Sequence, residues 1–381
     1  MSDEYEYHAK TLGHIKMIQP FLFFRHTCSL SPDPFFPENK REKPVYHFYN
    51  HRRQCEYRDH DNRDKYIMSG MSVEGVELLQ MVTTPYFTRE SVEKERGIIA
   101  EEIKMYADNA DAQVYERLFA VMFPDHPARI PIAGSVESIQ SITAQTLLDC
   151  YDAFYKPCNM ILCVAGKLPP ERVFALAREY TPKEAAPCVV RKTTAQTNAP
   201  LTRMTRREMD VAMPIFTVCV RLPDLERGDV KTEIACELAA ELTAGEASRC
   251  YQRLYEAGLI DAGFYAGFES LRELAMFAFG GDSESPEAVR DAVLEEAQRI
   301  LREGVDAEEL ARLKRSLLGR RLRELDSFGG TCNRICGYFF DGVDYLRFRE
   351  AFDAVTADDV LQILTHVTSE NACMSVILPR A

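Results

Sequence analysis

Hydrophobic and polar positions follow two periods along the chain, one typical of helices and one of strands. Apolar residues recur at helical spacing within residues 89–106, 112–122, 143–155, 286–302 and 306–325. Short apolar runs of strand length stand between these segments: NMILCVAG from Asn159, GFYAGF, AMFAFGG, and NACMSVILP from Asn371. We expect NMILCVAG to form a buried strand. The mixture of amphipathic helices and short strands predicts an α+β fold.

The pattern occurs twice. ITAQTLLDCYDAF with NMILCVAG matches VTADDVLQILTHV with NACMSVILP, each a capped helix, a short turn and a strand. Further upstream, the helix pair that ends at Glu102 matches a pair that ends near Arg320. Superposing the helix caps Thr88 and Asp306 places Glu102 opposite Arg320. We therefore expect two copies of one α+β unit, the second of which lacks the acid.

Composition shifts divide the chain into parts. Residues 1–65 hold six of the eight histidines and show little sustained period of either kind, so we expect weak or irregular structure there. Residues 181–200 contain three prolines and many small polar residues, which is typical of a linker. The expected organisation is an unmatched segment 1–65, an incomplete first domain 66–180, a linker 181–203 and a second domain 204–381.

Composition and charge narrow the class of function. The chain has 381 residues, 46% of them hydrophobic and 28% charged, with a formal net charge of −13. Nucleic acids and anionic membranes reward basic surfaces, so this charge argues against both and favours soluble, often basic, peptides. We see no signal peptide and no apolar run longer than a strand, and the twelve cysteines include no CxxC pair. We therefore expect a cytoplasmic protein.

Two carboxylates on the helix that starts after Thr88 need an explanation. Glu95 and Glu102 stand seven residues apart, which places them within roughly 20° of each other around a helix. They share the stripe of Val92 and Ile99, and a buried carboxylate must be paired, hydrogen-bonded or bound to a metal. The alternative is that the stripe lies at the flank of the helix and both acids reach water.

Three stretches carry a resemblance to a known family. PYFTRESVEKERGIIAEEIKMYADN, HPARIPIAGSVESI and FYKPCNMILCVAG resemble the insulinase and mitochondrial-processing-peptidase family of zinc metallopeptidases, in its bacterial processing-peptidase-like branch. The resemblance runs from about residue 66 to the C-terminus. It implies two homologous α+β domains, each a mostly antiparallel sheet backed by helices, that enclose short unfolded peptides, and it implies zinc as cofactor.

The resemblance also implies a ligand set. In the family, zinc is held by two histidines of a His-x-x-Glu-His helix and by a glutamate on a later helix. Position by position, that glutamate corresponds to Glu102, and Glu95 corresponds to a carboxylate that supports the site. This chain contains no His-x-x-Glu-His. The nearest string runs from His47 to His51 and has Asn50 in place of the general base, so the metal ligands expected are His47, His51 and Glu102 without a base. Chance histidines in an unrelated segment remain the alternative.

A second departure concerns substrate binding. Many members of the family place an Arg and a Tyr against the substrate carbonyl, and the matching positions here are Tyr255 and Asp261. The candidate substrate-binding residues are therefore Arg249 and Tyr255, with Arg253 as a neighbour. The alternative is that the arginines are surface cations of an amphipathic helix and that Tyr251 and Tyr255 belong to the core.

Three functional hypotheses follow. The first is an active zinc endopeptidase that hydrolyses peptides. The second is a non-catalytic member that keeps the chamber for short peptides and forms a homo- or hetero-oligomer with a related peptidase subunit. The third is a broken reading of an active gene, in which residues 1–65 come from a wrong start or a shifted frame. For the chain as written we favour a metallopeptidase-family protein without catalytic activity.

Overall fold

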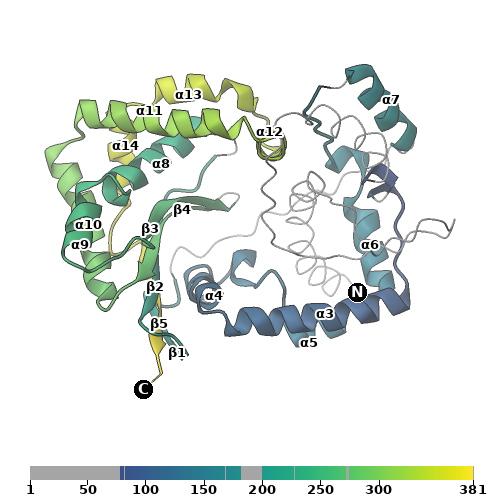
Figure 1. Cartoon of the computed structure of the whole chain (residues 1–381), viewed down its shortest axis with the longest axis horizontal. Helices are drawn as coiled ribbons and strands as arrows, with labels where there is room; N and C mark the ends of the chain where they lie inside the picture. Colours follow the sequence, from purple (N-terminus) through teal and green to yellow (C-terminus); the bar gives the residue numbers. More distant parts are fainter. Residues whose placement is uncertain are drawn as a thin grey trace, which may run out of the picture. The chain divides into compact units, whose positions relative to one another are not determined.

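The computed structural model describes residues 78–80, 82–167, 169–181, 200–226, 228–271 and 274–380 (Figure 1). They form two compact units. The first unit contains the described residues within Met1–Ile103, Ile132–Lys192 and Glu324–Gly337, and the second unit contains those within Lys104–Pro131, Thr193–Arg323 and Tyr338–Ala381. Residues 1–65 and residues 182–199 of the expected linker lie outside the described residues, so the expected domain boundaries remain predictions.

The described part of the first unit is helical. Its elements are α3 (Arg89–Asp108, which continues into the second unit), α5 (Val136–Gln140), α6 (Ala144–Phe154), η3 (Pro157–Asn159), α7 (Pro170–Tyr180) and most of α12 (Phe328–Phe340). Helix α3 begins where the sequence predicts, because Ser91 N–H donates to Thr88 Oγ1 and Thr88 N–H donates to Ser91 Oγ, both at 3.1 Å. Thr143 caps α6 in the same way.

The expected strand NMILCVAG is wrong. Asn159 ends the short helix η3, and residues 160–165 are irregular. Met160 and Leu162 are each 38% exposed, whereas the prediction required both to be buried. A strand is stabilised by a neighbouring strand, and none of the described strands pairs with this segment. The stretch from Asn371 that matches it in sequence does have neighbours on both sides and forms β5.

The second unit is built around a five-stranded sheet with the order β1-β5-β2-β4-β3. Its strands are β1 (Met204–Met209), β2 (Ile215–Arg221), β3 (Tyr265–Leu271), β4 (Leu274–Asp282) and β5 (Ala372–Pro379). Only the pair β1 and β5 is parallel, and the other three pairings are antiparallel. The α+β class with a mostly antiparallel sheet backed by helices is therefore confirmed for this unit.

Helices cover both faces of this sheet (Figure 1). Helices that lie between β2 and β5 in sequence cover one face: α8 (Val230–Ala244), α9 (Arg249–Glu256), α10 (Pro286–Glu303), α11 (Ala307–Glu324), α13 (Phe348–Ala354) and α14 (Ala357–Leu364). Helix α4 (Ala110–Met122) packs on the opposite face, against β1, β2 and β5. Its Leu118 is fully buried in a cluster with Cys219 of β2 and Cys373 of β5. The central strands are thus buried on both faces, which explains why their sequences are almost continuously apolar.

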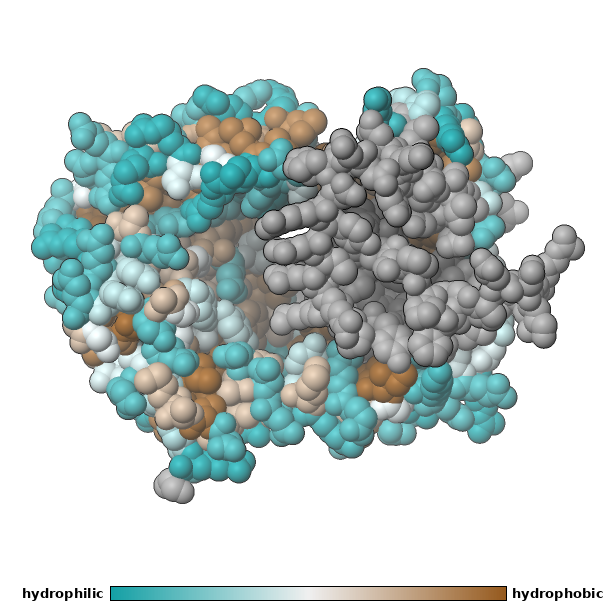
Figure 2. Space-filling model, in the orientation of Figure 1, coloured by the Kyte–Doolittle hydropathy of each residue, from teal (hydrophilic) through white to brown (hydrophobic). Residues whose placement is uncertain are grey.

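Helices of the second unit begin and end at identifiable signals. Gly245 follows the last residue of α8, and Ser248 accepts a hydrogen bond from Tyr251 N–H at the start of α9. Asp306 accepts one from Glu309 N–H at 2.7 Å at the start of α11. In Figure 2 the surface over α9 and α10 is mostly hydrophilic, as expected for their outward faces. No helix among the described residues is both long and apolar enough to cross a membrane.

Candidate functional site

The two carboxylates singled out on α3 share one side of that helix. Glu95 and Glu102 are half-buried, whereas Glu93 and Glu101 are exposed. Val92, at the start of the stripe, is 7% exposed, and Ile99 is half-buried. The expected stripe therefore exists, and the acids on it do not point fully into solvent. Whether Glu102 is a metal ligand and Glu95 its support remains a prediction.

A zinc site needs more donors than α3 provides. Zinc in proteins takes three or four protein ligands, and Glu102 supplies one oxygen donor. Within the ranges that the structure describes, no three His, Cys, Asp or Glu side chains are grouped so that they can hold a metal ion. The other two expected ligands, His47 and His51, lie outside the described residues. The described residues by themselves do not fit zinc.

The candidate substrate residues lie on α9. Arg249 is exposed at the first position of the helix, and Tyr255 is 52% exposed near its end. Six residues separate them, so they point in directions about 120° apart and do not share one face. Tyr255 stacks on Tyr251, with ring centroids 6.0 Å apart and ring planes 9° apart. Tyr251 in turn lies 6.0 Å from Phe264, so this part of α9 has a packing role whether or not Tyr255 binds a ligand.

His126 is a structural residue of its loop. It is 4% exposed, and its Nδ1 accepts a hydrogen bond from Ala128 N–H at 3.0 Å. The ring lies edge-on to Phe123, with centroids 6.4 Å apart. The side chain caps the short helix η2 (Pro127–Arg129) and is thereby held in one position.

A buried charged cluster in the second unit was not anticipated from the sequence. Arg321 on α11 is 3% exposed, and its guanidinium contacts Glu237 of α8 at 2.5 Å and Glu233 at 3.6 Å. Tyr338 Oη donates to Glu233 at 2.7 Å and accepts from Arg321 at 3.1 Å. Burial works to lower the pKa of Arg321, but Glu237, Tyr338 and Glu233 outweigh it, so this pKa lies above its usual value. The spacing of Glu233 and Glu237 on one helical face was the available signal.

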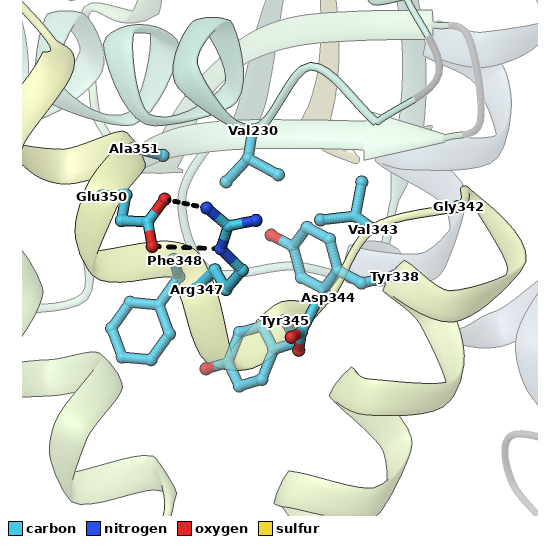
Figure 3. A pocket seen from close by; sticks show the side chains of 10 residues that line it. All are labelled: Val230, Tyr338, Gly342, Val343, Asp344, Tyr345, Arg347, Phe348, Glu350 and Ala351. Atoms are coloured by element: carbon cyan, nitrogen blue, oxygen red, sulfur yellow. Dashed lines mark hydrogen bonds and ion pairs between the residues drawn. The ribbon is translucent and has the colours of Figure 1, made fainter.

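Beside this cluster the surface of the second unit is hollowed into a cavity of about 370 Å³ (Figure 3). The rings of Tyr338, Tyr345 and Phe348 form a stacked row along it, with successive centroids 5.2 and 5.1 Å apart. Arg347 donates from Nε to Glu350 at 3.0 Å and from Nη2 at 2.6 Å, as the dashed lines in Figure 3 show. The one guanidinium in the lining is thus already neutralised by its neighbour.

A second polar cluster lies between α4 and the sheet. Tyr115 of α4 donates to Tyr265 Oη at 2.8 Å and lies 3.4 Å from Glu269 Oε1, and the hydroxyls of Tyr265 and Thr217 are 2.8 Å apart. Burial raises the pKa of Tyr115, of Tyr265 and of the Glu269 carboxyl. The alternation in YAGFESL places Tyr265 and Glu269 on one face of a strand. Nothing in the sequence indicates that α4 supplies their partner.

Comparisons with known proteins agree on the family. A profile described as the peptidase M16 inactive domain matches residues 141–317. An uncharacterized zinc protease of Bacillus subtilis, YmfH, is 30% identical over 313 residues, which cover 80% of this chain and 72% of that protein. An uncharacterized zinc protease of Streptomyces coelicolor is 26% identical over 316 residues, 78% of this chain and 67% of that protein.

Solved structures agree as well. A putative M16-like peptidase from Alicyclobacillus acidocaldarius has a TM-score of 0.75 at 27% identity, covering 80% of this chain and 74% of that one. A peptidase M16 inactive domain from Pseudomonas fluorescens has a TM-score of 0.68 at 19% identity, covering 81% and 75%, and supports the fold. The resemblance to the insulinase and processing-peptidase family is confirmed, with the His-x-x-Glu-His motif not intact in this sequence. The chain belongs to the peptidase M16 family of zinc-protease-like proteins.

Proposed function

We propose that this chain is a non-catalytic M16 protein that binds short unfolded peptides without cleaving them. The observation that carries the proposal is the sequence itself, which contains no His-x-x-Glu-His. Hydrolysis by this family requires a base inside that motif to activate the zinc-bound water. The nearest string has Asn50 at the position of the base, and an amide does not accept a proton at neutral pH.

The retained parts of the chain support a peptide-binding role. The second unit keeps a complete sheet with helices on both faces. Helix α3 keeps Glu95 and Glu102 half-buried on one side. The formal charge of −13 favours peptides with basic residues. In this proposal, enclosure of a peptide serves to hold or present it, and a zinc ion held by His47, His51 and Glu102 would lack the base that activates water.

A related peptidase subunit is the partner we propose. Ile98 of α3 and Phe174 of α7, both in the first unit, are 38% and 60% exposed. Large apolar side chains on a surface are typical of protein interfaces. An active homologue that docks there would supply the catalytic centre that this chain lacks.

The alternative is an active zinc endopeptidase, and the naming of the curated relatives as zinc proteases favours it. Two measurements on the full chain separate the functions. Zinc content is determined after reconstitution with the metal, and an internally quenched peptide is offered with and without a chelator. The proposal expects binding of a labelled peptide without cleavage. Chelator-sensitive cleavage would establish the alternative.

A further inference from the structure

Strand β3 forms one edge of the sheet in the second unit. In the sheet order it stands last, and β4 is the only described strand that pairs with it. An edge strand exposes one side of its backbone, which is a template for a further strand. The question is which groups β3 presents on that side.

The hydrogen-bond pattern of β4 shows which backbone groups of β3 face outward. Leu222 N–H donates to Ala275 O at 2.9 Å, and Ser283 N–H donates to Pro214 O at 3.0 Å, so odd-numbered residues of β4 bond toward β2. In an antiparallel pair the bonding direction alternates from residue to residue. The even-numbered residues of β4 therefore bond toward β3.

The register then identifies the free groups of β3. Gly267 lies opposite Ala278 and Glu269 opposite Met276, so the odd-numbered residues of β3 use their N–H and C=O groups inside the sheet. The N–H and C=O groups of the even-numbered residues point away from the sheet. Three consecutive even positions thus offer donors and acceptors along the open edge. These outward-facing positions are Ala266, Phe268 and Ser270.

Glu269 places an uncompensated carboxylate beside this edge. Its side chain is half-buried on the face that carries α4, and its contact is the Tyr115 hydroxyl at 3.4 Å. No lysine or arginine among the described residues forms an ion pair with it. A carboxylate that is removed from water without a cation is costly. A cation arriving at the edge would relieve that cost.

There is room for such a cation. Gly267, two residues before Glu269 on the same face, has no heavy atom within 4 Å of the position that a Cβ would take. A long side chain that crosses the edge can therefore lie over Gly267 and reach the carboxylate.

We propose that the open edge of β3 binds an extended peptide by strand addition, with a lysine or arginine of the peptide opposite Glu269. The inference rests on the proposed function, because it names where and how the peptide binds. In an antiparallel addition, Ala266, Phe268 and Ser270 form the hydrogen bonds. Glu269 then faces its opposite residue in a non-hydrogen-bonded pair, where side chains approach most closely.

The alternative role for Glu269 is protection of the edge, since inward-pointing charges keep other strands away from exposed edges. The two roles make opposite predictions. A protective acid repels every added strand, so replacing it improves binding. A recognising acid favours basic peptides, so replacing it weakens the binding of those peptides selectively.

The experiment uses the full chain and a fluorescein-labelled heptapeptide with alternating threonine and valine around one central lysine, with binding followed by anisotropy. The same peptide is prepared with norleucine for lysine, and with a single N-methyl group either on the lysine or on the residue that follows it. We expect norleucine to weaken binding at least about tenfold, as for a lost charged hydrogen bond. We expect N-methylation after the lysine to abolish binding and N-methylation of the lysine itself to be tolerated, because only alternate N–H groups face β3.

Two variants test the protein side. Glu269→Gln should remove the preference for lysine over norleucine and leave the norleucine peptide bound as before. Ala266→Pro removes one outward N–H while the bonds to β4 remain, and should weaken both peptides about threefold to tenfold. Leu322→Ala, at an exposed position of α11, is the control for non-specific effects of a substitution on peptide binding. The N-methyl comparison uses the unaltered chain and stays informative if Ala266→Pro does not fold.

The outcomes separate this inference from the proposed function. Peptide binding without cleavage, but equal for both N-methyl peptides and unchanged in Glu269→Gln, would overturn the β3 edge site and leave the proposed function standing. Tighter binding in Glu269→Gln would assign the acid to edge protection and also overturn the inference. Chelator-sensitive cleavage overturns the non-catalytic function while the pattern of N-methyl effects still decides the site.

Discussion

The guanidinium of Arg321 lies 2.5 Å from the carboxylate of Glu237, and this contact joins α11 to α8 inside the second unit. The Arg321 side chain is 4% exposed and that of Glu237 is 22% exposed. The ring of Phe352 lies 5.5 Å from the guanidinium carbon, so the charge is held between carboxylates and an aromatic face.

The position of this pair connects to the internal repeat. In the alignment of the two copies, Arg320 of α11 stands opposite Glu102 of α3. Arg320 forms an ion pair with Glu241, one turn along α8 from Glu237. Arginines on α11 thus face carboxylates on α8, and the two helices are joined by ion pairs.

Breaking the buried pair should be costly. Arg321→Met leaves Glu237 and Glu233 without their cation, and we expect the free energy of unfolding of the second unit to fall by about 3–5 kcal/mol. Chemical denaturation followed by circular dichroism measures the change. Arg349→Met is the control, because Arg349 and Asp353 are 64% and 67% exposed, and an exposed pair contributes about 1 kcal/mol or less. Equal losses in the two variants would contradict the burial of the cluster.

Two glycines of adjacent strands should respond in opposite ways to alanine. A Cβ at Gly280 of β4 would overlap the Phe216 carbonyl oxygen and lie 2.8 Å from Tyr265 Oη, whereas at Gly267 of β3 it would meet no heavy atom within 4 Å. We expect Gly280→Ala to destabilise the second unit by about 1–3 kcal/mol. Gly267→Ala should be neutral or stabilising by up to about 1 kcal/mol, since alanine reduces the entropy of the unfolded chain. Urea denaturation of both variants tests the register of β3 on β4.

The contribution of the Glu269 carboxyl to the stability of the second unit should decline as the pH rises. Burial raises its pKa in the folded protein. Between the unfolded pKa of about 4.3 and the raised pKa, the folded state therefore binds the proton more tightly than the unfolded state does. Its contribution to stability therefore declines as the pH rises through this window and is unfavourable above it. Glu269→Gln removes the effect. We expect a higher melting temperature than wild type at pH 7, by no more than about 2–4 °C, and no difference at pH 3.5. A lower melting temperature at pH 7 would show that the charged carboxylate is stabilising.

Helix α4 should behave as part of the second unit although it precedes the expected linker. Leu118 is fully buried against Cys219, Met276 and Cys373. Leu118→Ala should cost about 2–5 kcal/mol and reduce amide protection of β2 and β5 in hydrogen-exchange mass spectrometry. Leu322→Ala, at a side chain that is 50% exposed, should leave that protection unchanged. Protection of the two strands that is insensitive to Leu118→Ala would separate α4 from the sheet.

Much of the architecture was predictable because its signals are local. Thr88, Thr143, Asp306 and Thr356 each provide the hydrogen bond that starts a helix, and a cap is defined by three or four consecutive residues. The helix and strand around Asn371 were recognisable for the same reason. The strand expected from Asn159 was wrong because a strand depends on a neighbour, and an apolar run carries no record of whether one is present.

The clusters that could not be predicted depend on long-range pairing. Tyr115 meets Glu269 across 154 positions of sequence, and Arg321 meets Glu237 across 84. Each side chain alone is compatible with an ordinary exposed position, and only the packing of helix on sheet or of helix on helix brings the partners together. The expected ligands His47 and His51 fall outside the described residues, so that part of the site remains a prediction.

The most direct test of the account is cleavage of an internally quenched peptide by the full chain after reconstitution with zinc, with a chelator added to half of each sample. We expect no chelator-sensitive cleavage from the wild type, because Asn50 stands where the base is required. Asn50→Glu, which completes a His-x-x-Glu-His string, is the matched variant, and Glu102→Gln in that background should reverse any activity it gains. Cleavage by the wild type that the chelator abolishes would contradict the non-catalytic function.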